Sequence, residues 1–438
     1  MENLFKAYDI RGIYPSELTL DFAYKLGRAV AMHFTNETIV VGRDARIGSD
    51  RLAERLIAGI NDQGSNVIDI GLCSTPMLYF ATQESPGVMI TASHNPKEYN
   101  GFKICAKGGS PLGFPDGLSP IKSLIEQANF GRPKHKGKTR KKNISSDYVS
   151  HVREFKGRLK KLKVVIDAGN GMEGIIAPKV FGRLPVRIIP LFFEPDGSFP
   201  NRPPNPLKEN ALDKLVDAVK KNKADMGIAY DGDCDRVVFV DEKGNIARPD
   251  HILVLLAQHL LKENPHAKVL YDVRCSRIVK EKVTEMGGVA IMTRVGHTYI
   301  SHIMKEEQAL FAGEQSGHYY FRDNFCTDSG DIPAMLMMNI LSSEKKPLSK
   351  LLAQLKKYFN SGEISLPAEN KQQILKKIED EYSGKAKIYH IDGLSVEFPE
   401  WWFNIRSSHT EPVLRLNVEA GTKAMLDRKV SELKKLIS

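Results

Sequence analysis

Short apolar runs alternate with amphipathic stretches through most of the chain. Glu37 to Val41 is rich in β-branched residues and predicts a buried strand. Apolar positions at helical spacing follow it and predict a helix that Ser49 caps and Gly64 closes. Because strands and helices alternate in this way, the pattern predicts parallel strands joined by helical crossovers, an α/β fold.

A similar strand-and-loop unit occurs three times. The opening strand of each unit leads into an aspartate: Asp44, Asp167 and Asp272. A later strand leads into a second polar loop, which carries Ser93, Asp231 and Glu314. Ligands of open α/β sheets bind beyond the carboxyl ends of the strands. We therefore expect three similar α/β domains with mixed, mostly parallel sheets, whose polar loops face one shared cleft.

The last part of the chain has a different pattern. From about residue 363, strand candidates at 395–398, 401–407 and 412–420 precede a helix at Lys423 to Ile437. This predicts a smaller C-terminal α+β domain with a loop of its own. The expected division is 1–148, 149–250, 251–362 and 363–438, with a basic linker at about 131–143.

Composition and charge narrow the functional classes. The chain has 438 residues, of which 42% are hydrophobic, and a net charge of +10. Much of the excess charge lies between Arg132 and Lys142, where proline and glycine interrupt it, so this run predicts an exposed linker. No aromatic residues are interleaved with these charges, and we expect no nucleic-acid partner.

Several features predict a cytoplasmic location and no membrane partner. The five cysteines are scattered and form no CxxC pair, which favours reduced thiols. The N-terminal residues lack the basic and apolar regions of a signal peptide. The most apolar long stretch, Ile252 to Leu261, is about half the length of a membrane span. It predicts a buried helix.

The segment TASHNP places Ser93 between a strand and a turn. An exposed, rigid serine suits a nucleophile or phosphoryl carrier. A helix cap beside a surface histidine is the structural alternative. Neighbouring side chains on an extended strand point to opposite sides, which argues against His94 as the base for Ser93, and we do not predict a hydrolase triad.

The segment DGDCDR spaces Asp231, Asp233 and Asp235 by two residues. Carboxylates spaced in this way can converge on one side of a tight loop and bind Mg²⁺. A calcium EF-hand is excluded because Arg236 occupies the position that requires glycine and a strand follows at once. An acidic loop without a cation is the alternative, although Arg236 beside a metal can hold a phosphate.

Two further loops carry polar groups suited to a sugar phosphate. Glu314, Ser316 and His318 in GEQSGH can bond a sugar diol, or can simply close a turn. The segment RSSHTEP combines Arg406 with hydroxyls and backbone N–H groups that suit a dianionic phosphate, while Arg415 is a structural candidate.

In chain order, these segments closely resemble the α-D-phosphohexomutase superfamily, and its phosphomannomutase/phosphoglucomutase branch in particular. The resemblance covers nearly the whole chain and rests on FKAYDIRG, VGRDAR, TASHNP, YNGFK, DAGNG, DGDCDR, DVRC, RVGH, GEQSGHYYFRD and RSSHTEPVLRLNVEA. It implies four domains in a heart-shaped molecule with a central active cleft. It also implies a magnesium-dependent enzyme that interconverts hexose 1- and 6-phosphates of mannose, glucose or both through phosphoserine and a 1,6-bisphosphate.

The resemblance also implies roles for the matching residues. Ser93 would carry the phosphoryl group and bind Mg²⁺ with Asp231, Asp233 and Asp235. The residues expected near the reacting hydroxyl are Arg11, Lys103 and His297. The expected substrate contacts are Tyr8, Arg236, Arg274, Glu314, Ser316, His318, Arg406, Ser408, His409 and Thr410. Hexose phosphates are the expected small-molecule partners, a hexose 1,6-bisphosphate is the expected activator, and a monomer or weak dimer is expected.

Two positions depart from the family pattern. His409 replaces the usual asparagine, which would make phosphate binding pH-dependent, and Arg274 replaces a common lysine while keeping the charge. A phosphoglucosamine mutase is the alternative within the class. A metal-dependent sugar phosphatase and a non-catalytic sugar-phosphate sensor are alternatives from other classes. A sensor is disfavoured because Ser93 and the three aspartates are all present.

Overall fold

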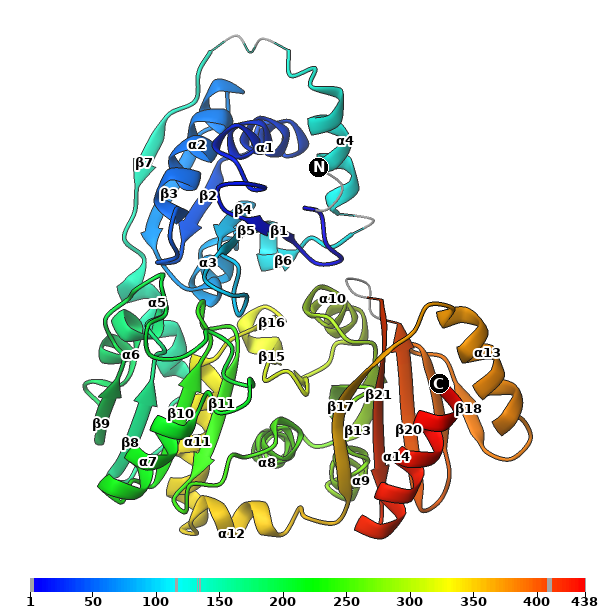
Figure 1. The fold of residues 1–438 in the computed structure, drawn as a ribbon. Helices are drawn as coiled ribbons and strands as arrows, with labels where there is room; N and C mark the ends of the chain where they lie inside the picture. The colour runs from blue at the N-terminus through cyan, green and yellow to red at the C-terminus, as the bar shows by residue number, and fades with distance from the viewer. Residues whose placement is uncertain (1–3, 115–116, 132, 134, 408–411, 438) are drawn as a thin grey trace.

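Four β-sheets form the frame of the molecule (Figure 1). The structure is a computed structural model, and it describes residues 4–114, 117–131, 133, 135–407 and 412–437. Three α/β domains with mixed sheets are followed by a C-terminal domain with an antiparallel sheet, as the sequence predicts. No helix of these residues combines the length and the apolar composition needed to cross a membrane.

The first domain has a seven-stranded sheet in the order β1-β5-β4-β2-β3-β7, with β6 on β5. Strands β2, β3, β4 and β7 are parallel, whereas β1, β5 and β6 pair antiparallel. The strands are β1 (Ile10–Ile13), β2 (Ile39–Arg43), β3 (Val67–Leu72), β4 (Gly87–Ile90), β5 (Tyr99–Ala106), β6 (Ser110–Pro111) and β7 (Thr139–Lys141). The helices are α1 (Leu20–His33), α2 (Ser49–Asp62), α3 (Thr75–Ala81) and α4 (Leu118–Gln127).

Two local predictions for this domain are wrong. Gly48, not Ser49, is the N-cap of α2, because the Ser49 hydroxyl donates instead to Asp44 Oδ1 at 2.7 Å. Part of the expected linker is a strand, since β7 pairs in parallel with β3 and extends the sheet. Three exposed residues make up β7, so backbone pairing rather than side-chain burial forms it, and the apolar pattern gives no signal for it.

The second domain has a four-stranded sheet in the order β11-β10-β8-β9. Its strands are β8 (Leu162–Asp167), β9 (Val186–Leu191), β10 (Met226–Tyr230) and β11 (Val237–Asp241). Its helices are α5 (Ser145–Glu154), α6 (Glu173–Phe181) and α7 (Asp213–Asn222). Only β11 is antiparallel to its neighbour. The loop between β10 and β11 therefore turns sharply, and this loop is DGDCDR.

The third domain has a five-stranded sheet in the order β13-β12-β14-β15-β16. Its strands are β12 (Lys268–Asp272), β13 (Val289–Thr293), β14 (Phe311–Gly313), β15 (Tyr319–Phe321) and β16 (Thr327–Asp328). Its helices are α8 (Pro249–Leu261), α9 (Ile278–Glu285), α10 (His297–Glu307), α11 (Asp331–Glu344) and α12 (Leu348–Ala353). Helix α8 contains the apolar stretch that the sequence predicts as a buried helix, and most of its residues are buried.

The C-terminal domain is an antiparallel sheet in the order β17-β21-β20-β19-β18. Its strands are β17 (Phe359–Pro367), β18 (Lys387–Tyr389), β19 (Leu394–Glu397), β20 (Trp401–Ser407) and β21 (Val413–Ala420). Helices α13 (Lys371–Tyr382) and α14 (Lys423–Ile437) accompany it, and α14 begins and ends where the sequence predicts.

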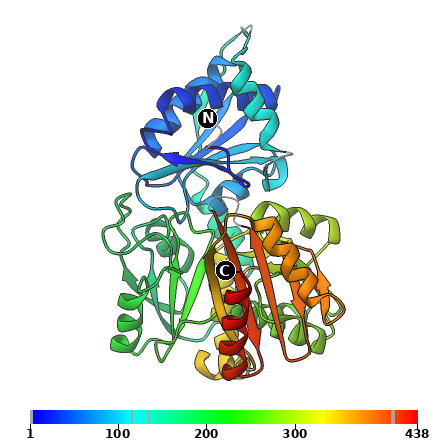
Figure 2. The ribbon, with the colours of Figure 1, turned by 45° about the vertical axis from the view of Figure 1, so that its right-hand side comes forward.

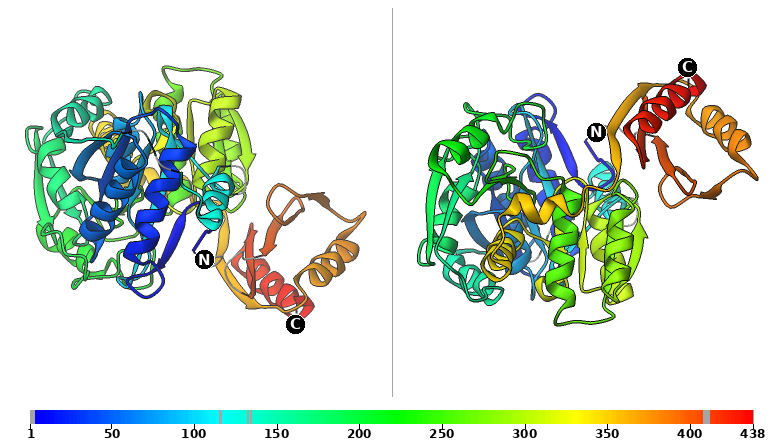
Figure 3. Two further views of the ribbon diagram at one scale, coloured as in Figure 1. Left: turned by 90° about the horizontal axis from the view of Figure 1, so that it is seen from above. Right: turned by 90° about the horizontal axis from the view of Figure 1, so that it is seen from below.

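One apolar core cluster extends across parts of the first three domains, and the C-terminal domain has a cluster of its own. One apolar cluster includes Tyr79 of the first domain, Phe239 of the second and Met335 of the third. The C-terminal domain buries a cluster of its own, which includes Phe403 and Leu416. Figure 2 shows the first three domains stacked together, and Figure 3 shows the C-terminal domain extending to one side on β17. Burial of shared apolar surface thus joins the first three domains as one frame.

Candidate active site

Ser93 lies at the contact between the first and second domains. It follows β4, and its hydroxyl donates a 2.8 Å hydrogen bond to Asp231 Oδ2, 138 residues further along the chain. Its φ of 50° is in the left-handed region, which is uncommon for a residue with a side chain. The expected meeting of the serine loop and the aspartate loop is therefore present in the folded chain.

His94 lies on the same side of the backbone as the Ser93 hydroxyl. Its Nδ1 lies 3.2 Å from Ser93 Oγ, although alternation along a strand predicts opposite sides. The positive φ of Ser93 breaks that alternation, so both side chains turn to the same side. Burial, with help from Arg236 and Arg11, lowers the pKa of His94 well below its ordinary value, and its imidazole is neutral.

The three aspartates of the loop between β10 and β11 converge as the sequence predicts. Carboxylate oxygens of Asp231, Asp233 and Asp235 all lie within 4.8 Å of one another, and the three residues are buried. Asp233 Oδ1 and Asp235 Oδ1 make no hydrogen bond within the described residues. Buried carboxylate oxygens at this spacing are a donor set that fits Mg²⁺.

Lys103 supplies the positive charge closest to these carboxylates. From β5, its ammonium group pairs with Asp233 at 3.0 Å and still more closely with Asp235. Burial disfavours its charge, but the two aspartates outweigh burial and raise the pKa of Lys103. Burial raises the pKa of Asp231 well above its ordinary value, and the two neighbouring aspartates raise it further. Lys103 is thus the cation in direct contact with two of the three aspartates.

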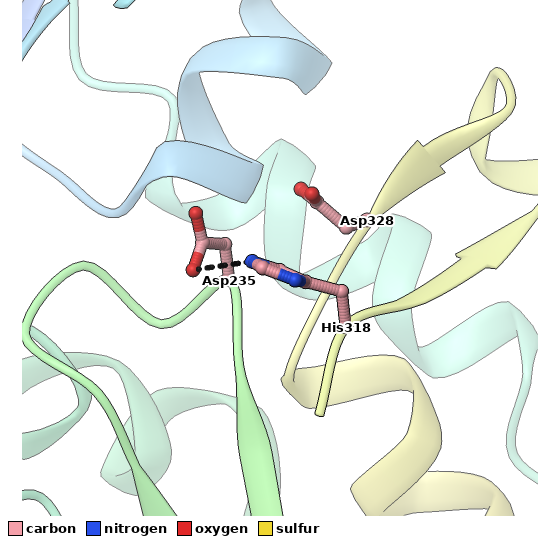
Figure 4. A group of neighbouring side chains, drawn as sticks. All are labelled: Asp235, His318 and Asp328. Carbon is pink, nitrogen blue, oxygen red and sulfur yellow. Dashed lines mark ion pairs between the residues drawn. The ribbon is translucent and has the colours of Figure 1, made fainter. Parts of the chain in front are cut away.

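A second group of ligand-type atoms joins the aspartate loop to the third domain (Figure 4). Asp235, His318 and Asp328 come together there, with His318 Nε2 3.4 Å from Asp235 Oδ1. Burial and Arg236 oppose the charge of His318, but Asp235 and Glu314 outweigh them and raise its pKa to about 9. Burial raises the pKa of Asp328 to about 7, with Asp235 adding to the effect. His318 is thus held as a cation between the carboxylates of Asp235 and Glu314.

The GEQSGH loop follows β14 and faces the same centre. Glu314 Oε2 accepts a 2.7 Å hydrogen bond from the Tyr320 hydroxyl and lies 3.1 Å from His318 Nδ1. Ser316 Oγ lies 2.9 Å from the same His318 nitrogen. Burial raises the pKa of Glu314, but His318 and Arg274 outweigh it and lower that pKa, so Glu314 is ionised. The loop therefore presents the Glu314 carboxylate as a fixed hydrogen-bond acceptor, with the Ser316 hydroxyl beside it.

Two aromatic side chains border this loop. Tyr8 lies with its ring 5.6 Å from that of His297, and its hydroxyl donates to the Val295 carbonyl at 3.0 Å. Burial lowers the pKa of His297 to about 3, and Lys103 adds to the effect. His297 is therefore neutral, and its Nε2 has no hydrogen-bond partner among the described residues.

Comparison with known proteins shows to which family the chain belongs. The family models described as "Phosphoglucomutase/phosphomannomutase" match all four parts, namely alpha/beta/alpha domains I (residues 2–132), II (146–244) and III (248–358) and the C-terminal domain (363–436). This chain belongs to the phosphoglucomutase/phosphomannomutase family.

Relatives of the family align over almost the full length. A phosphomannomutase of Methanocaldococcus jannaschii is 38% identical over 99% of this chain and 97% of its own. A phosphoglucomutase of Neisseria gonorrhoeae is 39% identical over 99% of this chain and 96% of its own. The crystal structure of a phosphoglucomutase/phosphomannomutase family protein from Burkholderia thailandensis superposes with a TM-score of 0.93 at 32% identity, covering 100% of this chain and 97% of that one.

Arginines gather at the junction of the third and C-terminal domains of this family member. Arg406 Nη2 pairs closely with Glu363 Oε2, and Arg415 Nη1 lies 3.0 Å from Glu363 Oε1. Burial disfavours the charge of Glu363, but Arg406, Arg274 and Arg415 lower its pKa. Two guanidinium groups thus pair with the Glu363 carboxylate. The expected phosphate ligands Ser408, His409 and Thr410 lie outside the described residues.

The remaining expected site residues have partners within the protein. Arg274 pairs with Asp272 at 2.7 Å and approaches Glu314 at 3.6 Å. Arg236 Nε lies 3.2 Å from His318 Nε2 and 3.9 Å from Asp231 Oδ2. Arg11 pairs with Asp9 at 2.6 Å, donates to the Ala92 carbonyl at 3.2 Å and also contacts Asn95. Arg11 thus contacts the serine loop, Arg236 the aspartate loop and Arg274 the GEQSGH loop.

Some residues of the site are not found by sequence reasoning. The Thr75 hydroxyl donates to Asp233 Oδ2 at 2.6 Å, and the Thr75 amide donates to the Asp233 carbonyl at 2.9 Å. Asp328 completes the group in Figure 4. Thr75 begins α3 directly after Ser74, a capping residue, and this local pattern predicts only a helix start. Neither residue belongs to a motif that indicates its partner.

Proposed function

We infer that this chain is a phosphohexomutase, which interconverts hexose 1-phosphate and hexose 6-phosphate, and we propose that phospho-Ser93 carries the transferred group. The observation that carries the proposal is the 2.8 Å contact of Ser93 Oγ with the buried aspartate loop. Phosphoryl transfer depends mainly on positioning and on neutralising charge, and this centre supplies both.

In the proposed reaction, the hexose hydroxyl oxygen forms a bond to the phosphorus of phospho-Ser93 while the bond to Ser93 Oγ breaks. The product is a hexose 1,6-bisphosphate, and the hydroxyl loses its proton. After the bisphosphate turns over, Ser93 Oγ takes back the phosphoryl group from the other end. His297 is a suitable acceptor of a hydrogen bond from the hydroxyl, because its imidazole is neutral and its Nε2 is unpaired.

Asp231, Asp233 and Asp235 would hold Mg²⁺, with Ser93 supplying a further oxygen. The bound ion would neutralise charge on the phosphoryl oxygens. Lys103, held between Asp233 and Asp235, fixes these two side chains in place. Glu314 and Ser316 would bond hydroxyls of the sugar, and Arg406 would bind the phosphate that is not transferred.

Ser93→Ala is the direct test of the carrier role. Turnover should fall by at least about 10³-fold, because the variant lacks the hydroxyl that would carry the phosphoryl group. Intact mass should show a phosphoryl adduct at Ser93 in the wild-type protein and none in the variant. Ser65→Ala, at a buried serine of the same domain, is the matched control and should keep full activity. Substantial turnover by the Ser93→Ala variant would reject the proposal.

The sugar preference is proposed from the relatives, which are named for mannose and for glucose. We propose that both mannose 1-phosphate and glucose 1-phosphate are substrates. Parallel assays with these two and glucosamine 1-phosphate, primed with hexose 1,6-bisphosphate as activator, decide the preference. Preferred turnover of glucosamine 1-phosphate would overturn the proposed preference for mannose and glucose phosphates. Stoichiometric release of inorganic phosphate would instead indicate a phosphatase. A cytoplasmic location and a monomer or weak dimer are part of the same proposal.

A further inference from the structure

Arg46 makes an unusual set of contacts with the serine loop. It follows β2 in the segment VGRDAR and is only 3% exposed. Its Nη1 donates to the carbonyls of Pro96 and Tyr99 at 2.9 and 3.0 Å. Its Nη2 donates to the carbonyls of Ser93 and Asn95 at 2.7 and 2.6 Å. One guanidinium thus binds four backbone oxygens of residues 93–99, the serine loop.

The serine loop needs such support because its conformation is strained. Ser93 has a φ of 50°, which persists in a residue with a side chain only when the surroundings fix it. Asp44 provides a second attachment. It accepts from the Arg46 amide at 2.9 Å and from the Thr91 hydroxyl at 2.7 Å, and Thr91 Oγ1 accepts from the Ser93 amide at 2.9 Å. The loop is therefore held from both its amide and its carbonyl side.

The guanidinium of Arg46 also contacts the second domain. Its Cζ lies 4.9 Å from the centre of the Phe199 ring, at the distance of a cation–π contact. A Cβ built on Gly197 would lie 2.5 to 2.7 Å from backbone atoms of residues 45–47, so the two backbones touch. A Cβ built on Gly232, in the aspartate loop, would lie 3.5 Å from the Phe199 ring. Arg46 therefore links the serine loop to the domain that carries the aspartates.

We propose that Arg46 is a positioning residue for phosphoryl transfer. It keeps the serine loop in the conformation that directs Ser93 Oγ at Asp231, and it fixes that loop against the second domain through Phe199. This proposal rests on the proposed function of Ser93. The Nη donors of Arg46 all bind the loop, and its Nε lies 3.4 Å from Asp44 Oδ2, so Arg46 acts through Ser93 and not on the substrate. Arginine is required because lysine offers a single nitrogen and no planar face.

Arg46→Lys tests the proposal with Arg28→Lys as the matched control. Arg28 lies on α1, donates to the carbonyls of Phe130 and Gly131, and stacks on the Phe130 ring at 5.2 Å. It therefore makes the same kinds of contact as Arg46, but not with the serine loop. Arg46→Lys should lower kcat by about 10²-fold, as displacement of a reacting group by about 1 Å does, with KM for the hexose phosphate within about 3-fold. Arg28→Lys should leave both unchanged. A kcat for Arg46→Lys within about 2-fold of the control would overturn the proposal.

Hydrogen exchange gives a readout that does not depend on activity. Amides of residues 93–99 should exchange at least about 10-fold faster in Arg46→Lys than in the wild type, and at the wild-type rate in Arg28→Lys. Unchanged exchange in Arg46→Lys would overturn the proposal. Absence of mutase turnover in the wild type would refute the proposed function alone, and the exchange contrast would still test Arg46.

A second variant covers the case in which Arg46→Lys does not fold. Phe199→Leu keeps the hydrogen bonds of Arg46 and removes only the ring face. It should lower kcat by about 10-fold at unchanged KM, with the exchange of residues 93–99 only slightly faster. Wild-type kcat in Phe199→Leu would refute the link between the serine loop and the second domain.

Discussion

Gly232, between Asp231 and Asp233 of the aspartate loop, gives the sharpest test of the site. A Cβ at this position would lie 2.7 Å from the Ser93 carbonyl oxygen, which is about 0.7 Å closer than the 3.4 Å at which ordinary contact begins. That oxygen is held by Arg46 at 2.7 Å, so it cannot move aside alone. Gly232→Ala should therefore separate the serine loop from the aspartate loop by several tenths of an ångström.

The size of this displacement sets the expected loss. Ser93 Oγ and Asp231 Oδ2 are 2.8 Å apart, so such a separation would stretch or break their hydrogen bond. Misplacement of reacting groups by about 1 Å costs about 10²-fold, so kcat should fall by about 10- to 100-fold. An added methyl group in a packed site costs about 1 to 3 kcal/mol of folding free energy. KM for the hexose phosphate should stay within about 3-fold, because the GEQSGH loop, which would bind the sugar, is not displaced.

The assay couples formation of hexose 6-phosphate to a dehydrogenase and is accompanied by thermal unfolding. Gly421→Ala is the matched control, because its Cβ would contact only the Glu400 carbonyl oxygen at 3.7 Å, an ordinary distance. The control should keep its activity and its melting temperature. Gly232→Ala with wild-type kcat and wild-type stability would refute the reasoning that these two loops are in fixed contact.

Three further predictions concern the metal, the support of the aspartates and the pH dependence of stability. Chelation with EDTA should abolish turnover and added Mg²⁺ should restore it; activity that survives chelation would contradict the metal assignment. Thr75→Val removes the 2.6 Å hydrogen bond to Asp233. The Mg²⁺ concentration for half-maximal activity should therefore rise by about 10-fold, while kcat at saturating Mg²⁺ stays within about 3-fold. An unchanged Mg²⁺ dependence would contradict this prediction. Burial raises the pKa of Glu173 well above its ordinary value and that of Asp331 to about 6, so the folded state retains protons that the unfolded state releases. The stability gained is complete below the ordinary pKa values of these groups, near about pH 4, and is lost as the pH rises through about 6 and above. The melting temperature should fall less steeply between about pH 5 and 8 in Glu173→Gln than in the wild type, and equal slopes would contradict the prediction.

Local patterns determined the fold class and much of the candidate site. The apolar run before each polar loop is a property of a few neighbouring residues. Strands β4, β10 and β14 end at Ile90, Tyr230 and Gly313, shortly before the polar loops that carry Ser93, Asp231 and Glu314, as the sequence predicts. The spacing of the three aspartates by two likewise brings their carboxylates together within one turn. Such features follow from backbone periodicity and steric limits, and these act over short distances along the chain.

The tertiary structure alone decided which groups touch. Thr75 and Asp233 are 158 residues apart, and nothing near either residue in the sequence indicates the other. The contact of His94 with Ser93 depends on a positive φ that the packing of the loop imposes, so strand alternation predicted the opposite. Strand β7 forms from exposed residues because an open sheet edge is available. These outcomes depend on how separate domains pack against one another, and the free energy of that packing is not encoded in any single segment.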